Sequence, residues 1–84
     1  MDNTMDRPLT LTYDELLAET RVALNMHIKN SSTPPDSFDR GCRSGIINFW
    51  FHLALKTSSS DEQRYEDHRQ LCLLAGLKPP ANVR

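Results

Sequence analysis

Two consecutive prolines, Pro34 and Pro35, restrict the fold of this chain more than any other feature of its sequence. Proline lacks a backbone N–H and its ring clashes with the preceding turn, so a helix interior does not accept such a pair. On both sides of the pair, apolar residues recur at spacings of three and four, which is typical of amphipathic helices. The segment 30–35, Asn-Ser-Ser-Thr-Pro-Pro, therefore separates two helices.

The helix before this break has a well-marked start. Thr12 and Glu15 match the T-x-x-E pattern of a capping box, in which each side chain accepts a hydrogen bond from a backbone N–H at the start of a helix. Apolar residues such as Leu17 and Leu24 then follow one helical face. The pattern predicts a helix over residues 13–30.

The helix after the break is predicted over residues 37–56. Either Asp36 or Ser37 can cap it, because a short polar side chain can accept a hydrogen bond from an unpaired N–H in the first turn. Asp39 adds a negative charge near the N-terminus, where the helix dipole favours one. Thr57 and three serines then end the helix.

A third helix is predicted over residues 60–75. Gly76 is placed to adopt the left-handed conformation that often closes a helix, and Leu77 can pack back on the last turn. Two pairs can cap the start of this helix, Ser59 with Glu62 or Ser60 with Gln63.

These elements predict an all-α fold, a small three-helix bundle in which short connections make neighbouring helices antiparallel. The chain has 84 residues, of which 38% are hydrophobic and 25% charged, as in an ordinary globular domain. We expect one three-helix domain over residues 12–78, preceded by an irregular arm over 1–11 and followed by a tail over 79–84.

Charge and hydropathy argue against two classes of partner. The formal net charge is −1, so the chain lacks the overall positive charge of proteins that grip nucleic acid mainly through its phosphates. The most apolar stretch, residues 46–55, has half of the roughly 20 residues that a membrane-spanning helix requires. Because residues 1–6 also lack an apolar signal core, we expect a cytoplasmic protein with no membrane partner.

The sequence offers little for catalysis or metal binding, and we expect neither an enzyme nor a cofactor. Cys42 or Cys72 could be drawn with His68 as a nucleophile and base, but a bundle this small has little room for the cleft that such chemistry needs. His68 and Cys72, four residues apart, could also ligate a metal ion. Burial of both cysteines as free thiols is the favoured interpretation.

Gly41 and Gly45 form a G-x-x-x-G pair inside the second predicted helix. In water such a pair removes side chains from one stripe and lets another helix approach closely. Each glycine costs up to about 1 kcal/mol of helix stability relative to alanine in a helix interior. We therefore expect close packing of a neighbouring helix to offset this cost. We favour the first helix as the neighbour over a second copy or a foreign partner.

The aromatic triplet Phe49-Trp50-Phe51 is the most unusual feature of the second predicted helix. Successive helix residues are rotated by about 100°, so the three rings spread over more than half of the circumference. In one interpretation the helix is central, and the connections and the N-terminal arm cover its flanks. In the other, one or two of four residues stay exposed as a binding patch: Phe49, Trp50, Phe51 and Leu55.

We therefore expect a regulator, adaptor or inhibitor that binds another protein through its second helix, with a homodimer as one form of that interaction. Stand-alone chains of this size are often encoded by bacteriophages or mobile elements, which would place this one in a host cytoplasm. The first alternative is a DNA-binding regulator that uses residues of the third helix, Gln63, Arg64, His68 and Arg69. The second alternative is a small metal-binding protein.

Overall fold

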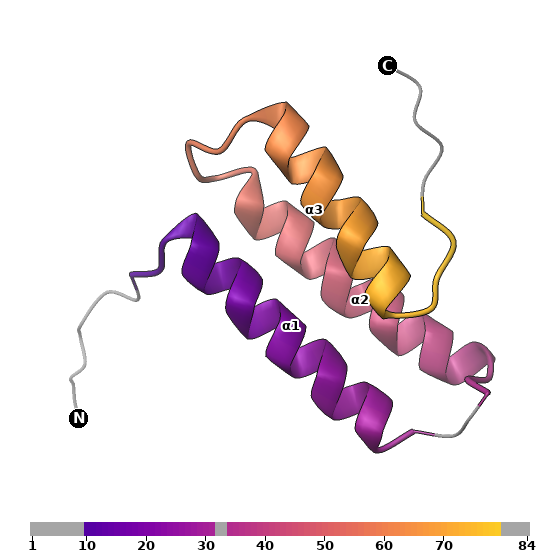
Figure 1. Ribbon diagram of the computed structural model, residues 1–84. Coiled ribbons are helices and arrows are strands. Elements are labelled where there is room, and N and C mark those ends of the chain that lie inside the picture. Colours follow the sequence, from indigo (N-terminus) through magenta and orange to yellow (C-terminus); the bar gives the residue numbers. More distant parts are fainter. Residues whose placement is uncertain (1–9, 32–33, 80–84) are drawn as a thin grey trace, which may run out of the picture.

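Three α-helices joined by short connections form the fold (Figure 1). A computed structural model describes residues 10–31 and 34–79, and within these ranges there is no β-strand. The all-α class is therefore confirmed. Most of the predicted arm and tail lies outside the described residues. The helices are α1 (Tyr13–Lys29), α2 (Ser37–Ala54) and α3 (Asp61–Leu74), each within two residues of its predicted bounds.

Capping side chains fix where α1 and α2 begin. The Thr12 hydroxyl accepts a hydrogen bond from the Glu15 N–H at 3.0 Å, and the Glu15 carboxylate accepts one from the Thr12 N–H at 2.9 Å. At α2 the cap is Asp36 rather than Ser37, and Asp39 completes a second capping box. The first box is the one that the sequence predicts, and the second satisfies two further backbone donors.

The two ends of α3 are also determined by single residues. Of the two candidate caps, Ser60 is the one used, and its hydroxyl accepts a hydrogen bond from the Gln63 N–H at 3.1 Å. At the other end Gly76 has a φ of +74°, and the Leu77 N–H donates to the Cys72 carbonyl at 2.8 Å. This is the predicted left-handed helix closure, which only glycine adopts without strain.

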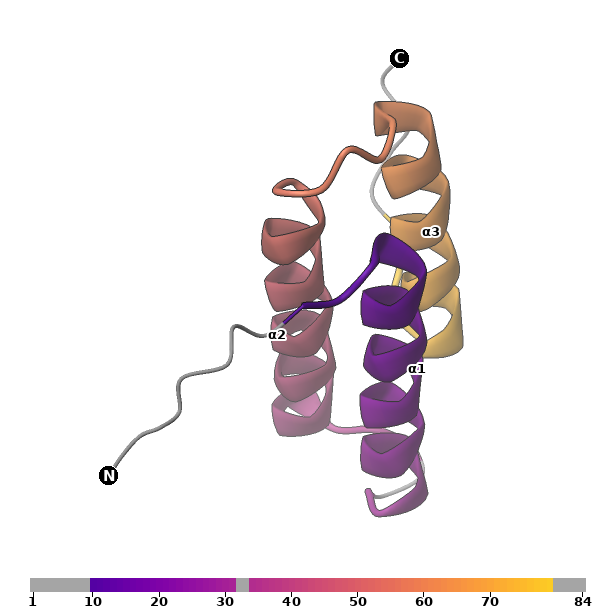
Figure 2. The same ribbon diagram turned by 90° about the vertical axis from the view of Figure 1, so that its left-hand side faces the viewer.

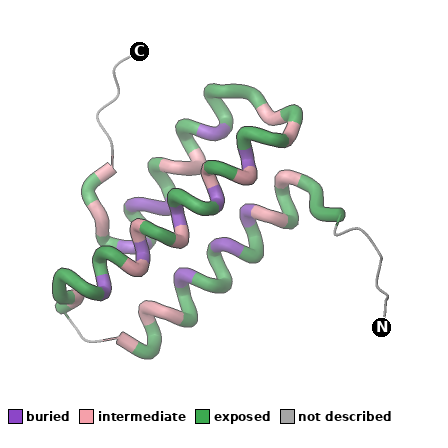
Figure 3. The backbone as a smooth tube through the Cα atoms, turned by 180° about the vertical axis from the view of Figure 1, so that it is seen from behind, coloured by how far each residue is buried: buried purple, intermediate pink, exposed green. Residues whose placement is uncertain are grey.

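The second helix is the central element, since α2 packs against both α1 and α3. Figure 2 shows α1 and α3 together on one side of α2, so the opposite side of α2 has no described helix against it. The buried positions of the three helices face one another (Figure 3). The core consists of Leu17, Leu24, Ile47, Trp50, Ala54, Leu71, Cys72 and Ala75.

Two polar side chains form hydrogen bonds that link the helices around this core. Arg43 of α2 is buried, and its guanidinium donates to the Ala75 carbonyl and to the Ser31 hydroxyl, both at 2.8 Å. It therefore joins the end of α3 to the connection that follows α1. Tyr13 of α1 donates its hydroxyl to the Asp67 carboxylate of α3 at 2.6 Å, and burial together with this contact raises the pKa of Tyr13.

None of the helices in the described ranges combines the length and the apolar character needed to cross a lipid bilayer. Even α2, the most apolar of the three, carries charged residues along much of its first half.

Candidate functional site

The aromatic triplet is divided between the core and the surface. Trp50 is only 1% exposed, and its ring lies 6.2 Å from that of Tyr13 and 6.4 Å from that of His68. Phe51 is half-buried against the same core. Phe49, by contrast, is 64% exposed. Because α2 has helices on one side only, one ring of the three enters the core fully and one points away from it.

Four residues were candidates for an exposed binding patch. Of these, Phe49 and Leu55 are exposed, and the exposed fraction of Leu55 is 52%. Trp50 cannot contact a partner while the domain stays folded, so its inclusion among the binding residues is revised. Its indole N–H is buried without a hydrogen-bond partner among the described residues, so packing of the ring is its contribution to the fold. Phe51 keeps part of its ring at the surface.

Two exposed aromatic residues lie on a side of α2 away from its buried residues. Phe38 is 74% exposed, more than any other large apolar residue of the described chain. At about 100° per residue, Phe38 and Phe49 project within about 20° of each other, three turns apart. We call this surface the outer stripe; its residues are Phe38, Cys42, Gly45 and Phe49.

Phe38 is the functional candidate that the sequence interpretation missed. It was counted as one more apolar residue of the second helix, although its eleven-residue separation from Phe49 places both on one face. That spacing was the available signal. What the sequence did not show is that the shared face points away from the core.

The glycine pair does not make the close internal packing that was expected. A Cβ atom added at Gly41 or at Gly45 would meet no heavy atom within 4 Å outside its own helix. Both glycines are exposed. The preference for α1 as their neighbour was therefore wrong, and the two glycines leave open space on the surface of α2.

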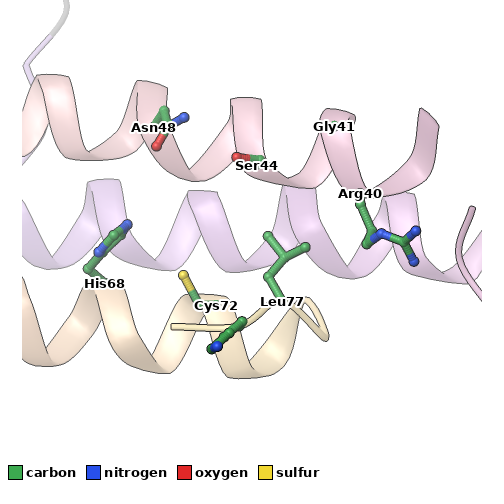
Figure 4. A pocket seen from close by; sticks show the side chains of 8 residues that line it. Arg40, Gly41, Ser44, Asn48, His68, Cys72 and Leu77 are labelled. Atoms are coloured by element: carbon green, nitrogen blue, oxygen red, sulfur yellow. The ribbon is translucent and has the colours of Figure 1, made fainter. Parts of the chain in front are cut away.

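A groove of about 490 Å³ lies between α2 and α3 (Figure 4). Its lining carries two cationic side chains and no carboxylate, together with several neutral polar groups. Gly41 forms part of its wall, so the missing side chain there widens the groove. The residues that line it are Arg40, Gly41, Ser44, Asn48, His68, Cys72, Leu77 and Lys78.

His68 and Cys72 both line the groove, but their surroundings do not favour the thiolate form of Cys72. Burial lowers the pKa of His68 and raises the pKa of the Cys72 thiol, so the imidazole and the thiol are both favoured in their neutral forms. The His68 ring stacks on Trp50 at an interplanar angle of 11°. A nucleophilic cysteine needs the opposite electrostatics, a thiolate stabilised by positive charge.

The residues considered for DNA binding do not form one surface. Arg64 is buried and donates hydrogen bonds to the Ser59 carbonyl and to Asp61. Arg69 is paired with Glu66 at 3.1 Å. Gln63 is exposed and His68 is half-buried beneath the aromatic rings of α2. The geometry therefore gives no support to a recognition helix.

Within the described residues, no three side chains of the types His, Cys, Asp or Glu are grouped so that they could hold a metal ion. His68 and Cys72 share the groove as expected from their spacing, but Cys42, His27 and His52 do not line it. Comparison with known proteins finds no matching family, curated protein or solved structure.

Proposed function

We propose that this protein acts by binding another protein through the outer stripe of α2, as a regulator, adaptor or inhibitor without chemistry of its own. One observation carries the proposal. Phe38 and Phe49 are 74% and 64% exposed on the same helical face, away from the buried core of the domain. Single exposed apolar residues are common, but two aligned aromatic rings are typical of an interface.

The composition of the stripe fits this role. Aromatic side chains are enriched among the residues that dominate binding energy, particularly where small neighbours leave a depression beside them. Here Gly45 lies one turn before Phe49, with open space above it. A partner can therefore place an apolar side chain over Gly45 and against the exposed ring of Phe49.

The test is capture of the partner from the cells that naturally contain this protein, using a tagged chain and mass spectrometry. The variant Phe38→Ser/Phe49→Ser is expected to reduce capture by about tenfold or more, since binding hot spots exceed about 2 kcal/mol each. The captured protein is then purified and its affinity for both chains measured directly.

The matched control is Val22→Ser/Met26→Ser on α1. These residues are also exposed, by 50% and 60%, and they lie on the side of α1 that faces away from the core. The control is expected to capture the same partner as the unmodified chain. Equal capture by all three chains, with all three folded, would overturn the proposal.

A further inference from the structure

The groove between α2 and α3 holds positive charge that no carboxylate of the described chain neutralises. Arg40 and Lys78 both line it, and neither forms an ion pair within the described residues. Arg64 and Arg69, by contrast, are each paired with a carboxylate of α3. The whole chain has 11 acidic and 10 basic side chains, so the excess of positive charge is a local property of this groove.

The carboxylates closest to the groove along the chain have partners elsewhere. Asp36 and Asp39 form the capping box at the start of α2. On α3, Asp67 accepts a hydrogen bond from Tyr13, and Glu66 lies in an ion pair on the surface of its own helix. Since a cleft lined by one sign of charge concentrates ions of the other sign, this groove favours an anion.

The groove also contains hydrogen-bonding groups that the described chain does not use. Arg40 donates one hydrogen bond, to the Pro35 carbonyl at 3.0 Å, and a guanidinium has five donors. The side chains of Ser44 and Asn48 have no hydrogen-bond partner among the described residues, and they lie one turn apart on the α2 wall. These groups are available to a ligand that replaces the water around them.

The two ends of the groove differ in chemistry. Figure 4 shows Arg40 at one end and Asn48 with His68 at the other, and Leu77 lies between the ends. The eight positions from Arg40 to Asn48 correspond to about 12 Å along α2 at about 1.5 Å per residue. The volume of about 490 Å³ is that of a small-molecule site. A matching ligand therefore has an anionic group at one end and hydrogen-bonding groups toward the other.

We propose that this groove binds a small organic phosphate monoester whose phosphate is held by Arg40 and Lys78. The body of the ligand lies along Ser44 and reaches Asn48 and His68. A phosphate monoester carries about −1.5 to −2 charges near pH 7, which matches two cations, whereas a single carboxylate leaves one of them unbalanced. The guanidinium can donate two parallel hydrogen bonds to phosphate oxygens, and the ammonium adds a point charge.

This site is separate from the outer stripe and does not rest on the proposed function. At about 100° per residue, Ser44 and Asn48 project about 80–140° around α2 from Phe38 and Phe49. Phe38→Ser/Phe49→Ser is therefore expected to bind the monoester as the unmodified chain does. A chain without ligand binding can still capture a protein partner through the stripe.

The first test is an NMR titration of the full chain with three monoesters: adenosine monophosphate, uridine monophosphate and glucose phosphate. At least one of them is expected to bind with a dissociation constant below about 1 mM and to shift the side-chain signals of Asn48 and His68. Adenosine, which lacks the phosphate, should not bind. Absence of these shifts with all three monoesters up to about 10 mM would overturn the proposal.

Inorganic phosphate distinguishes a ligand site from general attraction of anions. It is expected to bind at least about tenfold more weakly than the best monoester, because it makes no hydrogen bonds at the far end of the groove. Equal affinity for inorganic phosphate and the monoesters, without a change at Asn48 or His68, would identify an adventitious ion only. That result would also overturn the proposal.

The second test removes the two charges. Arg40→Gln/Lys78→Gln is expected to weaken the best monoester at least about tenfold, because hydrogen bonds between charged groups are the strong ones. The matched control, Arg21→Gln/Lys29→Gln, removes two exposed cations of α1 and changes the net charge equally. It should keep the affinity of the unmodified chain. Equal loss of affinity in both variants would contradict binding in the groove.

The third test blocks the groove and leaves its charges in place. A Cβ added at Gly41 meets no neighbour, so Gly41→Phe is expected to fold and to set its ring against the groove. It should weaken the best monoester about tenfold through steric exclusion. Gly45→Phe is the control, since Gly45 has the same open space but does not line the groove. Equal affinity in these two variants would overturn the placement of the ligand.

Discussion

Two neighbouring aromatic residues, Phe49 and Trp50, have opposite roles at the scale of the single residue. Trp50 is enclosed by rings of α1, α2 and α3, while Phe49 is mostly in solvent. Trp50→Ala is expected to lower the free energy of unfolding by about 3–5 kcal/mol, as other truncations of buried aromatic residues do. Phe49→Ala should change it by less than about 0.5 kcal/mol.

Urea unfolding followed by circular dichroism measures both changes. If Phe49→Ala destabilised the isolated domain as much as Trp50→Ala, the ring of Phe49 would be packed inside and not on the outer stripe. A dilute sample is required, because association through the stripe would add apparent stability to the unmodified chain.

The second residue-scale prediction concerns His68 and pH. Burial lowers its pKa below the ordinary value of 6.5, so the folded chain holds this proton less tightly than the unfolded chain. Its neutral form contributes stability above about pH 6.5, and that contribution is lost as the pH falls through the lower folded value. Stability should therefore fall as the pH drops below about 6.5, and His68→Gln should make that fall shallower.

The carboxyl groups of Asp36 and Glu66 affect stability in a separate, lower pH range. The Asp39 backbone N–H lowers the pKa of Asp36, and the Gln70 amide lowers that of Glu66. Their contributions are lost only below about pH 4. Denaturation midpoints measured across both ranges distinguish the groups. An unchanged pH profile in His68→Gln would show that the imidazole is not responsible.

At the scale of the element, a glycine inside α2 and the glycine that follows α3 predict opposite responses to the same substitution. Gly45→Ala should stabilise the isolated domain by up to about 1 kcal/mol, because alanine favours a helix interior and the space there is open. Gly76→Ala should destabilise it by about 1–2 kcal/mol, because the φ of +74° is unfavourable for a residue with a Cβ. Thermal unfolding of the two variants gives both signs, and loss of stability in Gly45→Ala would contradict the open surface.

Arg43 supports a further prediction at this scale, since it joins three segments of the chain. Arg43→Met keeps much of the side-chain volume but removes the hydrogen bonds to the Ala75 carbonyl and the Ser31 hydroxyl. We expect a loss of about 2–3 kcal/mol, because hydrogen bonds from a charged donor are strong and a buried carbonyl is left unpaired. Amide exchange should rise first at the end of α3. Unchanged exchange there would contradict the linking role.

At the scale of the whole molecule, local signals in the sequence predicted most of the fold. The capping residues Thr12 and Ser60 and the closing Gly76 act through the backbone of their own turn, so their roles can be inferred without knowledge of the tertiary structure. The packing direction of α2 could not be inferred in this way. Residues such as Ile46 and Phe49 are both apolar, and only the positions of α1 and α3 decide which of them is covered.

The same limit explains the errors about the candidate site. Gly41 and Gly45 were expected to approach α1, but a small residue permits a close neighbour without specifying one. Trp50 was grouped with the binding residues because neighbouring aromatic residues cannot be ranked for burial by type alone. The groove between α2 and α3 depends on the segment after Gly76, which folds back to place Leu77 and Lys78 beside α2.

The most direct test of the outer stripe as a binding surface is the reactivity of Cys42 inside the cell. In a Cys72→Ala chain Cys42 is the only cysteine, and it lies between the two exposed rings of the stripe. Its alkylation rate is measured in living cells and in dilute purified protein, with the denatured chain as the reference. Coverage of the stripe, by a second copy or by another protein, predicts much slower alkylation in cells. Equal rates in both settings would contradict it.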